Sequence, residues 1–407
     1  MKKSAATRKF GWSVAILAAA LAVSTAPVAV AAPASDGLDF YSPAPELVAG
    51  EHGSVISSRP IVGEPGLPGA RNYLVLYRSV DLQGQPVAVS GTLAVPEGVA
   101  PAGGWPLISW AHGTTGTADV CAPSRDTGVG FPAHDYTSLT RGTLAQWVAA
   151  GYAVAQTDYQ GLGTPGPHGY LIGEAQQRAV ADMALASRAV APEVGARWVA
   201  MGHSQGGQAA VFANARAQQW VPQLELLGSV ALAPASHLGL VVQAGVVSKR
   251  TGLGAKVAPA GSLSFMPLFV RGAQTVADID PTKFLAPEAA SKIDQADDRC
   301  IGQLRAKDSW GEIGANEAFS ADADPSALIR VLDDNDPTGL TFTAPLLVLQ
   351  GKADVVVMPT GTDAMVAQQQ LTGRPVEYRT YPGVDHRGVL AAGNNDALTW
   401  VNARFGR

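Results

Sequence analysis

The stretch Arg197–Asn214, which reads RWVAM-GHSQG-GQAAVFAN, decides the fold. A short apolar run comes first, the pattern G-x-S-x-G follows, and a small-residue helical segment ends it. This order predicts a strand, a sharp turn that carries Ser204, and a helix. In so sharp a turn a Cβ on Gly202 or Gly206 would collide with its neighbours, so only glycine fits. The turn would present the Ser204 hydroxyl and leave the Gln205 amide, at the helix start, free to bind an anion.

The pentapeptide at 202–206 is weak by itself, because the chain holds 45 Gly among 407 residues. A glycine-rich turn with a solvent-facing serine would carry the same pattern. The interpretation of Ser204 as a nucleophile therefore depends on whether the rest of the chain supplies its partners.

Composition fits a large globular protein, with 47% hydrophobic residues, 15% charged residues and a formal net charge of −5. No basic stripe occurs, which argues against nucleic acid as a partner. The first 32 residues combine a positive start, an apolar run at 12–23 and the small residues Ala29-Val-Ala31. They predict a secretory signal peptide cleaved near Ala31 or Ala32, and hence a secreted or periplasmic protein. The alternative is a membrane anchor, for which the apolar run is short.

The two cysteines, Cys121 and Cys300, can form one disulfide in an export compartment, with two buried free thiols as the alternative. In the chain-entropy model, closing a loop of about 180 residues stabilises the fold by up to about 5 kcal/mol. The seven histidines are scattered and show no paired ligand spacing, so we expect no metal site and no cofactor.

Strand and helix signals alternate after residue 70 and predict an α/β fold, with a mostly parallel central sheet flanked by helices. Residues 33–70 are rich in Pro and Gly and are expected to form an irregular lead-in. The expected strands are 72–80, 86–95, 105–111, 152–157, 198–201, 226–233, 345–350 and 376–381. The expected helices are 138–150, 174–190, 205–219, 360–371 and 389–403.

The alternation breaks between 236 and 340, which predicts an inserted cap, or lid, in a core made of 33–235 and 341–407. Its position, at the carboxyl ends of strands, is where such sheets bind ligands. We expect a polar helix at 287–307 and an acidic loop at 333–337. Two apolar segments, 238–247 and 262–270, could line an acyl tunnel, open onto a lipid interface, or form the cap's own small core.

Chain order selects the general base. In a G-x-S-x-G hydrolase the serine is followed by an acid and then by a histidine. Only His237 and His386 come after Ser204. His237 opens the insertion, before every plausible acid on the late strands, whereas His386 lies in the loop after the last strand. His386 is therefore the expected base.

The acid should follow the preceding strand. Asp354 lies four residues past the strand 345–350, at the same edge of the sheet. It would fix the tautomer of His386 and stabilise the imidazolium that forms during attack. Asp385 is adjacent to the base and cannot easily bond its neighbour's ring, and Asp363 lies inside a helix.

The segment His112-Gly-Thr-Thr-Gly116 follows the early strand 105–111 and predicts an oxyanion hole. Its second amide would lie beside that of Gln205, and each such donor typically lowers a barrier by a few kcal/mol. Thr114 is assigned this amide, and Thr115 stays a rival because a one-residue shift is easy here. His112 precedes the serine and is interpreted as structural.

With these residues in place, the chain resembles the α/β-hydrolase superfamily over about residues 70–400, and within it the secreted lipase and esterase family of bacteria and fungi. The matching motifs are HGTTG at 112–116, DYQGLG at 158–163, GHSQGG at 202–207, GKAD at 351–354 and DH at 385–386. The resemblance implies hydrolysis of carboxylic esters, with a triad of Ser204, Asp354 and His386.

The resemblance also implies substrate contacts. Asp158 and Tyr159 match a family loop that shapes the pocket wall, and Thr115 is grouped with them as substrate-binding. The alternative for Asp158 is a strand-end aspartate that bonds local backbone. The expected partner is a small-molecule ester or lipid, with transient contact to a lipid interface and no obligate protein partner.

The expected mechanism is attack by Ser204 while His386 takes its proton, which gives an acyl-enzyme that water releases. Activity should then fall as His386 becomes protonated below neutral pH. An amidase, a peptidase or an acyltransferase could use the same triad, and a non-catalytic binding protein could share the scaffold. Acyl chain length, alcohol preference, interfacial activation and oligomeric state are left open by the sequence.

Overall fold

The computed structural model describes Met1 and residues 37–252, 262–371, 373 and 375–407. The predicted signal peptide, apart from Met1, lies outside the described residues. By its contacts the chain divides into two units, Met1–Ala31 and Ala32–Arg407. Among the described helices, none has both the length and the apolar character that a membrane span requires.

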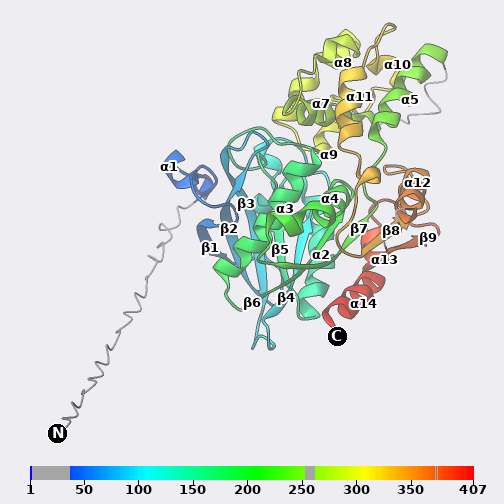
Figure 1. The fold of residues 1–407 in the computed structure, drawn as a ribbon. Helices are drawn as coiled ribbons and strands as arrows, with labels where there is room; N and C mark the ends of the chain where they lie inside the picture. The colour runs from blue at the N-terminus through cyan, green and yellow to red at the C-terminus, as the bar shows by residue number, and fades with distance from the viewer. Residues whose placement is uncertain (2–36, 253–261, 372, 374) are drawn as a thin grey trace. The chain divides into compact units, whose positions relative to one another are not determined.

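One sheet organises the second unit (Figure 1), and its described strands follow the order β1-β2-β3-β5-β4-β6-β7-β8-β9. In the order β1-β2-β3-β5, neighbouring strands pair in antiparallel fashion. From β5 onward, in the order β5-β4-β6-β7-β8-β9, all neighbours are parallel. The mostly parallel sheet predicted from the sequence is confirmed. The strands are β1 (Val55–Ile61), β2 (Ala70–Val80), β3 (Pro86–Pro96), β4 (Trp105–Ala111), β5 (Ala153–Thr157), β6 (Val194–His203), β7 (Glu225–Leu232), β8 (Leu346–Gly351) and β9 (Val376–Tyr381).

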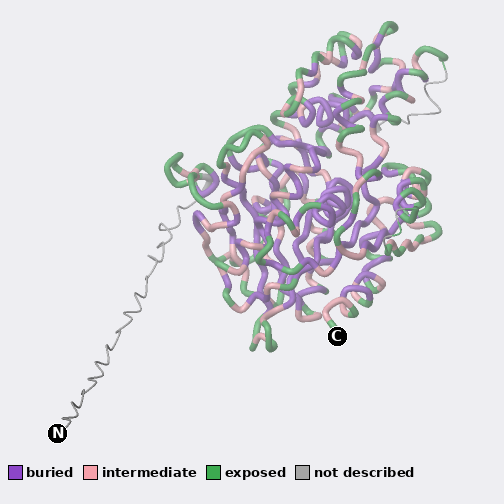
Figure 2. The backbone as a smooth tube through the Cα atoms, viewed as in Figure 1, coloured by how far each residue is buried: buried purple, intermediate pink, exposed green. Residues whose placement is uncertain are grey.

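Helices cover both faces of the sheet, because its central strands are apolar on both sides. On β8, Leu346 and Val348 pack with α4 and α12, whereas Leu347 and Leu349 pack with α2 and α14. The buried backbone in Figure 2 is concentrated accordingly along the sheet and its facing helices. The core helices are α2 (His134–Ala149), α3 (Gly173–Val190), α4 (Gln205–Trp220), α12 (Pro359–Gln370), α13 (Val389–Ala392) and α14 (Asn394–Phe405).

Two expectations about the core were wrong. The lead-in is not irregular throughout, since it contains η1 (Gly37–Tyr41), α1 (Pro45–Val48) and the edge strand β1. The strand β1 is defined by its pairing with β2, which local sequence propensity does not reveal. Its Pro60 is tolerated because β1 is an edge strand. The terminal helix is also interrupted, because α13 ends and α14 begins around Gly393.

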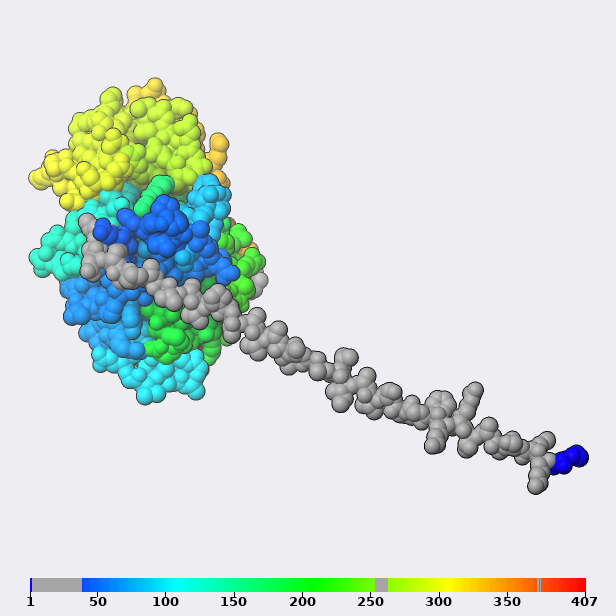
Figure 3. All heavy atoms as spheres, turned by 90° about the vertical axis from the view of Figure 1, so that its left-hand side faces the viewer, coloured from blue at the N-terminus to red at the C-terminus, as the bar shows by residue number. Residues whose placement is uncertain are grey.

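Residues 236–340, here called the inserted segment, follow β7 and precede β8. In Figure 3 their yellow and orange atoms gather at one end, next to the core. Their buried apolar side chains form one cluster with the core segment 170–175. The helices are α5 (Leu238–Thr251), α7 (Met266–Gln274), α8 (Pro287–Ala290), α9 (Ile301–Leu304), α10 (Ala315–Ala318) and α11 (Ser326–Asp334), with 3-10 turns η4 (Ser262–Phe265), η5 (Pro281–Lys283), η6 (Ile293–Asp297) and η7 (Pro337–Gly339).

The expected polar helix at 287–307 is wrong, because α8, η6 and α9 replace it. The chain cannot continue as one helix through Cys300, whose backbone forms a β-bridge with Gly116 of the core. The expected acidic loop is shorter than predicted, since α11 extends through Asp334.

The predicted disulfide is confirmed. Cys121, at the end of η2 (Asp119–Cys121), is bonded to Cys300, with 5.5 Å between their Cα atoms and 179 residues between them in sequence. Neither cysteine is free. The bond joins a core loop to the inserted segment, directly beside the loop that follows β4.

Candidate active site

The turn after β6 holds Ser204 in a strained conformation. Its φ is 61° and its ψ is −116°, and α4 begins at the next residue. A Cβ added to Gly202 would lie 2.1 Å from the carbonyl oxygen of Gly206, and one added to Gly206 would lie 1.9 Å from that of Ala111. Both positions therefore require glycine, as the sequence predicted.

Backbone strain gathers at this edge of the sheet. Among the described residues, five other than glycine have positive φ: Tyr159, Leu171, Ser204, Ala233 and His237. Three of them lie within two residues of the carboxyl end of a strand, namely β5, β6 and β7. Such conformations cost about 1–3 kcal/mol each and persist where the surroundings enforce them, often at functional sites.

The loops after β8 and β9 bring Asp354 and His386 together. His386 Nδ1 lies 2.7 Å from Asp354 Oδ2, in the geometry of a base oriented by an acid. Asp354 is 3% exposed, and its Oδ1 accepts the amides of Val356 and Val357 at 2.8 and 2.9 Å. Gln350 donates to Oδ2 at 3.1 Å. The carboxylate is thus fixed before any substrate binds.

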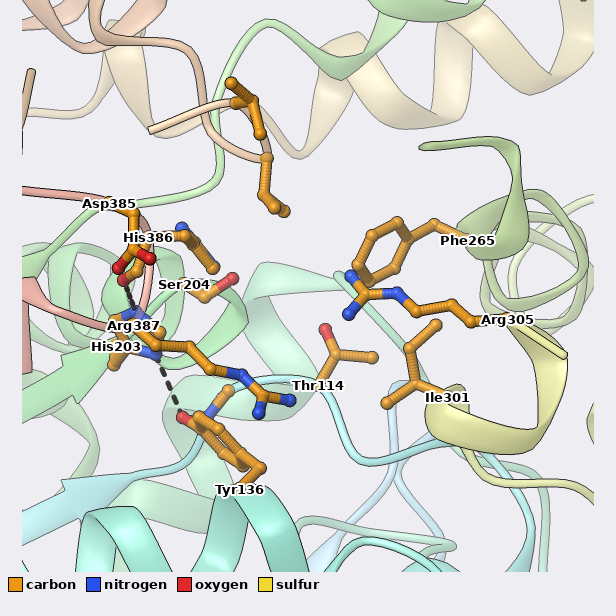
Figure 4. Close-up of a pocket in the computed structure, with 13 residues that line it drawn as sticks. Thr114, Tyr136, His203, Ser204, Phe265, Ile301, Arg305, Asp385, His386 and Arg387 are labelled. Carbon is orange, nitrogen blue, oxygen red and sulfur yellow. Dashed lines mark hydrogen bonds between the residues drawn. The ribbon is translucent and has the colours of Figure 1, made fainter. Parts of the chain in front are cut away.

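Ser204 and His386 line one cavity, and the serine hydroxyl faces its open centre in Figure 4. No hydrogen bond joins the serine hydroxyl to the imidazole in the described structure. Such contacts are often loose without substrate and tighten in the reacting complex.

The two residues expected to supply oxyanion amides, Gln205 and Thr114, both line the larger cavity with Ser204. Gln205 is the first residue of α4, where N–H groups have no partner within the helix. Thr114 lines the cavity with Ser204, and its hydroxyl is 2.7 Å from that of Tyr170. Thr115 is fully buried and lines neither cavity at the serine, and its carbonyl accepts the Ile301 amide at 2.8 Å. This placement favours Thr114 over its rival for the second amide.

A hydrogen-bonded chain, which the sequence analysis did not find, runs beneath Ser204. The Gly113 amide donates to the Tyr136 hydroxyl at 2.8 Å, and that hydroxyl is 3.0 Å from His203 Nδ1. His203 Nε2 is 2.8 Å from the carbonyl oxygen of His386. Figure 4 shows the last two contacts as dashed lines.

The chain allows one assignment of protons. A carbonyl only accepts, so His203 Nε2 carries the hydrogen and its Nδ1 accepts from Tyr136. Burial, followed by the nearby His386, holds the pKa of His203 well below its usual range, which keeps the ring neutral. This series of hydrogen bonds therefore links the loop of Gly113, next to Thr114, to the loop that carries His386. His203 could have been suspected as the second residue of the G-x-S-x-G pattern, but nothing local marks Tyr136.

The expected substrate contacts Asp158 and Tyr159 do not line the cavities at Ser204. Asp158 is buried and accepts Ser90 Oγ at 2.7 Å and the Ser124 amide at 2.9 Å, and burial raises the pKa of its carboxyl group. The Tyr159 hydroxyl donates to the His112 carbonyl at 2.8 Å. Both residues lie behind the loop at 112–116.

Two cavities meet at Ser204. The larger, about 460 Å³, has apolar walls that include Leu171, Ala235, Leu238 and Phe269. Its volume is within the usual range for small-molecule sites. The smaller, about 210 Å³, has a mixed wall. His386 and the polar or charged side chains of Tyr136, His203, Arg305, Asp385 and Arg387 line it, together with the apolar Phe265, Ile301, Val355 and Val356.

One other group has ligand-like chemistry. The ligand atoms of Glu64, Asp126 and His134 lie within 4.8 Å of one another, a group that the sequence analysis did not anticipate. Arg141 donates to Asp126 at 3.0 Å and also pairs with Glu64, and His134 Nδ1 is 2.9 Å from Asp126. Because Arg141 already pairs with both carboxylates and His134 contacts Asp126, the arrangement is that of an ion-pair network.

The sheet order and the site at its carboxyl edge define an α/β-hydrolase. Among solved structures, lipase A of Candida antarctica in its closed state superimposes with a TM-score of 0.70 at 18% identity, covering 93% of this chain and 87% of that one. The likeness confirms the predicted fold.

The chain belongs to the secretory lipase family, whose family model matches residues 136–407. It is 25% identical over 403 residues to Lipase A of Arthroderma benhamiae, covering 93% of this chain and 81% of that protein. It is 24% identical over 338 residues to a probable inactive lipase of Mycobacterium tuberculosis, covering 81% and 73%. The predicted class, a carboxylic ester hydrolase, is confirmed by the family.

Proposed function

We propose that the protein cleaves carboxylic esters through an acyl-enzyme on Ser204. His386 takes the serine proton and then protonates the leaving alcohol, while Asp354 holds the ring and stabilises its charged form. The amides of Gln205 and Thr114 bind the oxyanion. The observation that carries the proposal is one geometry: a strained serine at a helix start shares a cavity with a histidine that is 2.7 Å from a buried aspartate.

The two cavities bind different parts of the substrate. Because His386 protonates the leaving group, the alcohol belongs in the smaller cavity, which His386 lines. The acyl chain then occupies the larger apolar cavity, part of whose wall comes from the inserted segment. On this basis residues 236–340 act as the cap of a core made of 33–235 and 341–407.

Lipid esters suit this arrangement. Val355 and Val241 line the larger cavity and are 73% and 51% exposed, so its mouth is apolar on the outside as well. Transient contact with a lipid interface would cover these side chains. The disulfide is typical of an oxidising compartment, which supports export through a signal peptide in the first 32 residues.

The buried residues behind the oxyanion loop act by positioning. Tyr136 and His203 couple the loop of Gly113 to the loop of His386, and Asp158 and Tyr159 brace the same loop from the other side. Because these side chains are fixed by hydrogen bonds, they would hold the amide of Thr114 and the base in register.

The test is a chain-length series of nitrophenyl esters on wild type and Ser204→Ala. We expect a loss of kcat of about 10⁶-fold in the variant, with an unchanged thermal melt, because the nucleophile is removed without a change in packing. Anilides and alcohol acceptors, run in parallel, separate an esterase from an amidase or acyltransferase. Ester turnover that is equal in both proteins would overturn the role of Ser204. Absence of turnover in wild type would place the chain with its relative named as inactive.

A further inference from the structure

Arg305 lines the active-site cavities and has no carboxylate partner among the described residues. It follows α9 and lines both cavities with Ser204. Its guanidinium lies 5.0 Å from the centre of the Phe265 ring. In Figure 4 the guanidinium and the Ser204 hydroxyl face the same open space from opposite walls. Part of the residue is exposed although it lies against the cavity wall, so a ligand in the cavity can reach it.

Two other arginines of the inserted segment form ion pairs. Arg271 lies 2.8 Å from Asp294 and also contacts Asp297, and Arg299 lies 3.2 Å from Asp308. Among the described residues, no carboxylate lies within ion-pair distance of Arg305. Its five N–H donors, arranged as a planar fork, therefore have no protein acceptor in the described structure.

A second cation faces the first. Arg387 lines the smaller cavity, directly after His386 in the chain, with its guanidinium 5.5 Å from the centre of the Tyr136 ring. Burial lowers the pKa of Arg305, and repulsion from Arg387 adds to the shift. Arg387 is held by an exposed ion pair with Asp135 at 2.8 Å. Asp385 is also on this wall, where its carboxylate accepts the Gly388 amide at 2.7 Å.

The charge of this wall has a consequence for the substrate. With a neutral ester, the guanidinium of Arg305 would either stay hydrogen-bonded to water or lose those hydrogen bonds without gaining others. A carboxylate or phosphate would accept two parallel hydrogen bonds from the fork, in the geometry that arginine favours. Arg305 lines both cavities, whereas Arg387 lines only the smaller one, so the two guanidinium groups come together on the side of the leaving alcohol.

We infer that the enzyme prefers esters whose alcohol part carries an anionic group, a carboxylate or a phosphate, which Arg305 binds with support from Arg387. The inference rests on the proposed function, because it uses the division of the substrate between the two cavities. Arg305 and Arg387 are thus specificity-determining residues for the alcohol. The acyl part stays apolar.

The experiment uses hexanoyl esters of three alcohols of similar size: 3-hydroxybenzoate, 3-hydroxyphenyl phosphate and the neutral 3-hydroxybenzamide. The measured quantity is the ratio of kcat/KM for each anionic ester to that for the neutral ester, divided by the same ratio for hydroxide hydrolysis. Wild type should give a ratio well above one for at least one anion, and the better anion identifies the chemistry. High salt should reduce the ratio, because screening weakens the attraction.

Four variants sharpen the test. Arg305→Gln should lower the ratio about tenfold or more, mainly through KM, since hydrogen bonds to charged groups are among the stronger ones. Arg305→Lys should retain part of the preference for the anionic ester, because the positive charge remains although the planar guanidinium is lost. Asp135→Asn should raise the ratio by freeing Arg387. Arg299→Gln, at a paired arginine away from the cavities, is the control and should leave the ratio unchanged.

A wild-type ratio at or below one, or a ratio equal in wild type and Arg305→Gln, overturns the inference. These results are separable from a failure of the proposed function. If hydrolysis of the neutral ester depends on Ser204 but the ratio does not depend on Arg305, only the anion preference is wrong. If hydrolysis of the neutral ester survives Ser204→Ala, the proposed function itself is wrong.

Discussion

The core and the inserted segment differ in the kind of structure that positions their side chains. In the core, β4, β6, β8 and β9 end at one edge of the sheet in a fixed parallel register, and each delivers a residue or loop to the site. In the inserted segment, α8, α9 and α10 have four residues each and are joined by turns. A disulfide and one β-bridge anchor it at Cys300. The triad candidates thus come from long-range strand pairing, whereas the inserted segment contributes wall residues from helices and turns that are not part of the sheet.

The largest expected effect comes from breaking the core at the nucleophile turn. In Gly206→Ala the new Cβ would lie 1.9 Å from the Ala111 carbonyl oxygen, and backbone on both sides cannot move away. We expect a loss of more than about 3 kcal/mol in the free energy of unfolding, or no folded protein. Thermal melts measure the change.

The matched control lies in the inserted segment. In Gly302→Ala, within α9, the nearest atom to the new Cβ would be the Pro132 carbonyl oxygen at 3.5 Å. Stability should stay level or rise by up to about 1 kcal/mol, because alanine is the better helix former. A Gly206→Ala protein that melts like wild type would contradict the rigidity assigned to the core.

The same difference explains what the sequence could predict. The triad candidates were found because apolar strands of the core are continuous and chain order leaves one histidine, His386, after the last strand. The hydrogen bonds through Tyr136 were missed, because Tyr136 and His203 are 67 residues apart in sequence and no local pattern marks the contact. The strand β1 was missed for the same reason, as its pairing with β2 defines it.

Within the inserted segment, periodicity was misleading. Residues 287–307 are polar enough to suggest one exposed helix, but the chain turns at Cys300 to meet Gly116. The partners of each arginine also cannot be read from sequence, because they are set by how short elements pack. That is why the unpaired Arg305 was found only in the structure.

The next effect concerns the anchor between the two regions. Removing the disulfide, in Cys121→Ala/Cys300→Ala, should lower the free energy of unfolding by up to about 5 kcal/mol, because it releases a loop of 179 residues in the unfolded chain. It should also loosen the inserted segment beside the loop that follows β4. The measurements are melting and ester turnover, with and without reductant for wild type. An unchanged melting temperature and an unchanged ester turnover under reductant would contradict the view that the disulfide tethers the inserted segment to the core.

A smaller effect tests positioning inside the core. Tyr136→Phe removes the acceptor of the Gly113 amide and the donor to His203, and should lower kcat about tenfold with little change in KM. The control is Tyr152→Phe, which loses a hydrogen bond of 2.6 Å to Asn402 on the same face of the sheet. It should lose similar stability and keep its kcat. Equal kcat values for the two variants would show that the chain beneath Ser204 is only structural.

The smallest expected effect concerns two ion pairs, one in the core with a buried carboxylate and one in the inserted segment with an exposed carboxylate. His52 Nδ1 lies 2.6 Å from Oδ1 of Asp182, which is buried and also accepts Ser79 Oγ and Trp220 Nε1. The hydrogen bond with Asp182 raises the pKa of His52, and burial opposes the rise. By contrast, the carboxylate of Asp308 is 71% exposed, and Arg299 keeps its charge between pH 5.5 and 8.5.

The sign of the pH dependence follows from the raised pKa. A group whose pKa is higher in the folded state adds stability below its unfolded pKa, about 6.5 for histidine, and loses that contribution as the pH rises through the folded value. The difference in melting temperature between wild type and His52→Gln should therefore be larger at pH 5.5 than at pH 8.5. For Arg299→Gln the difference should be small and equal at both values, since surface pairs contribute about 0–1 kcal/mol. A His52→Gln difference that is constant, or that grows toward pH 8.5, would mean that the imidazole is neutral beside Asp182 and that the core holds this network by packing alone.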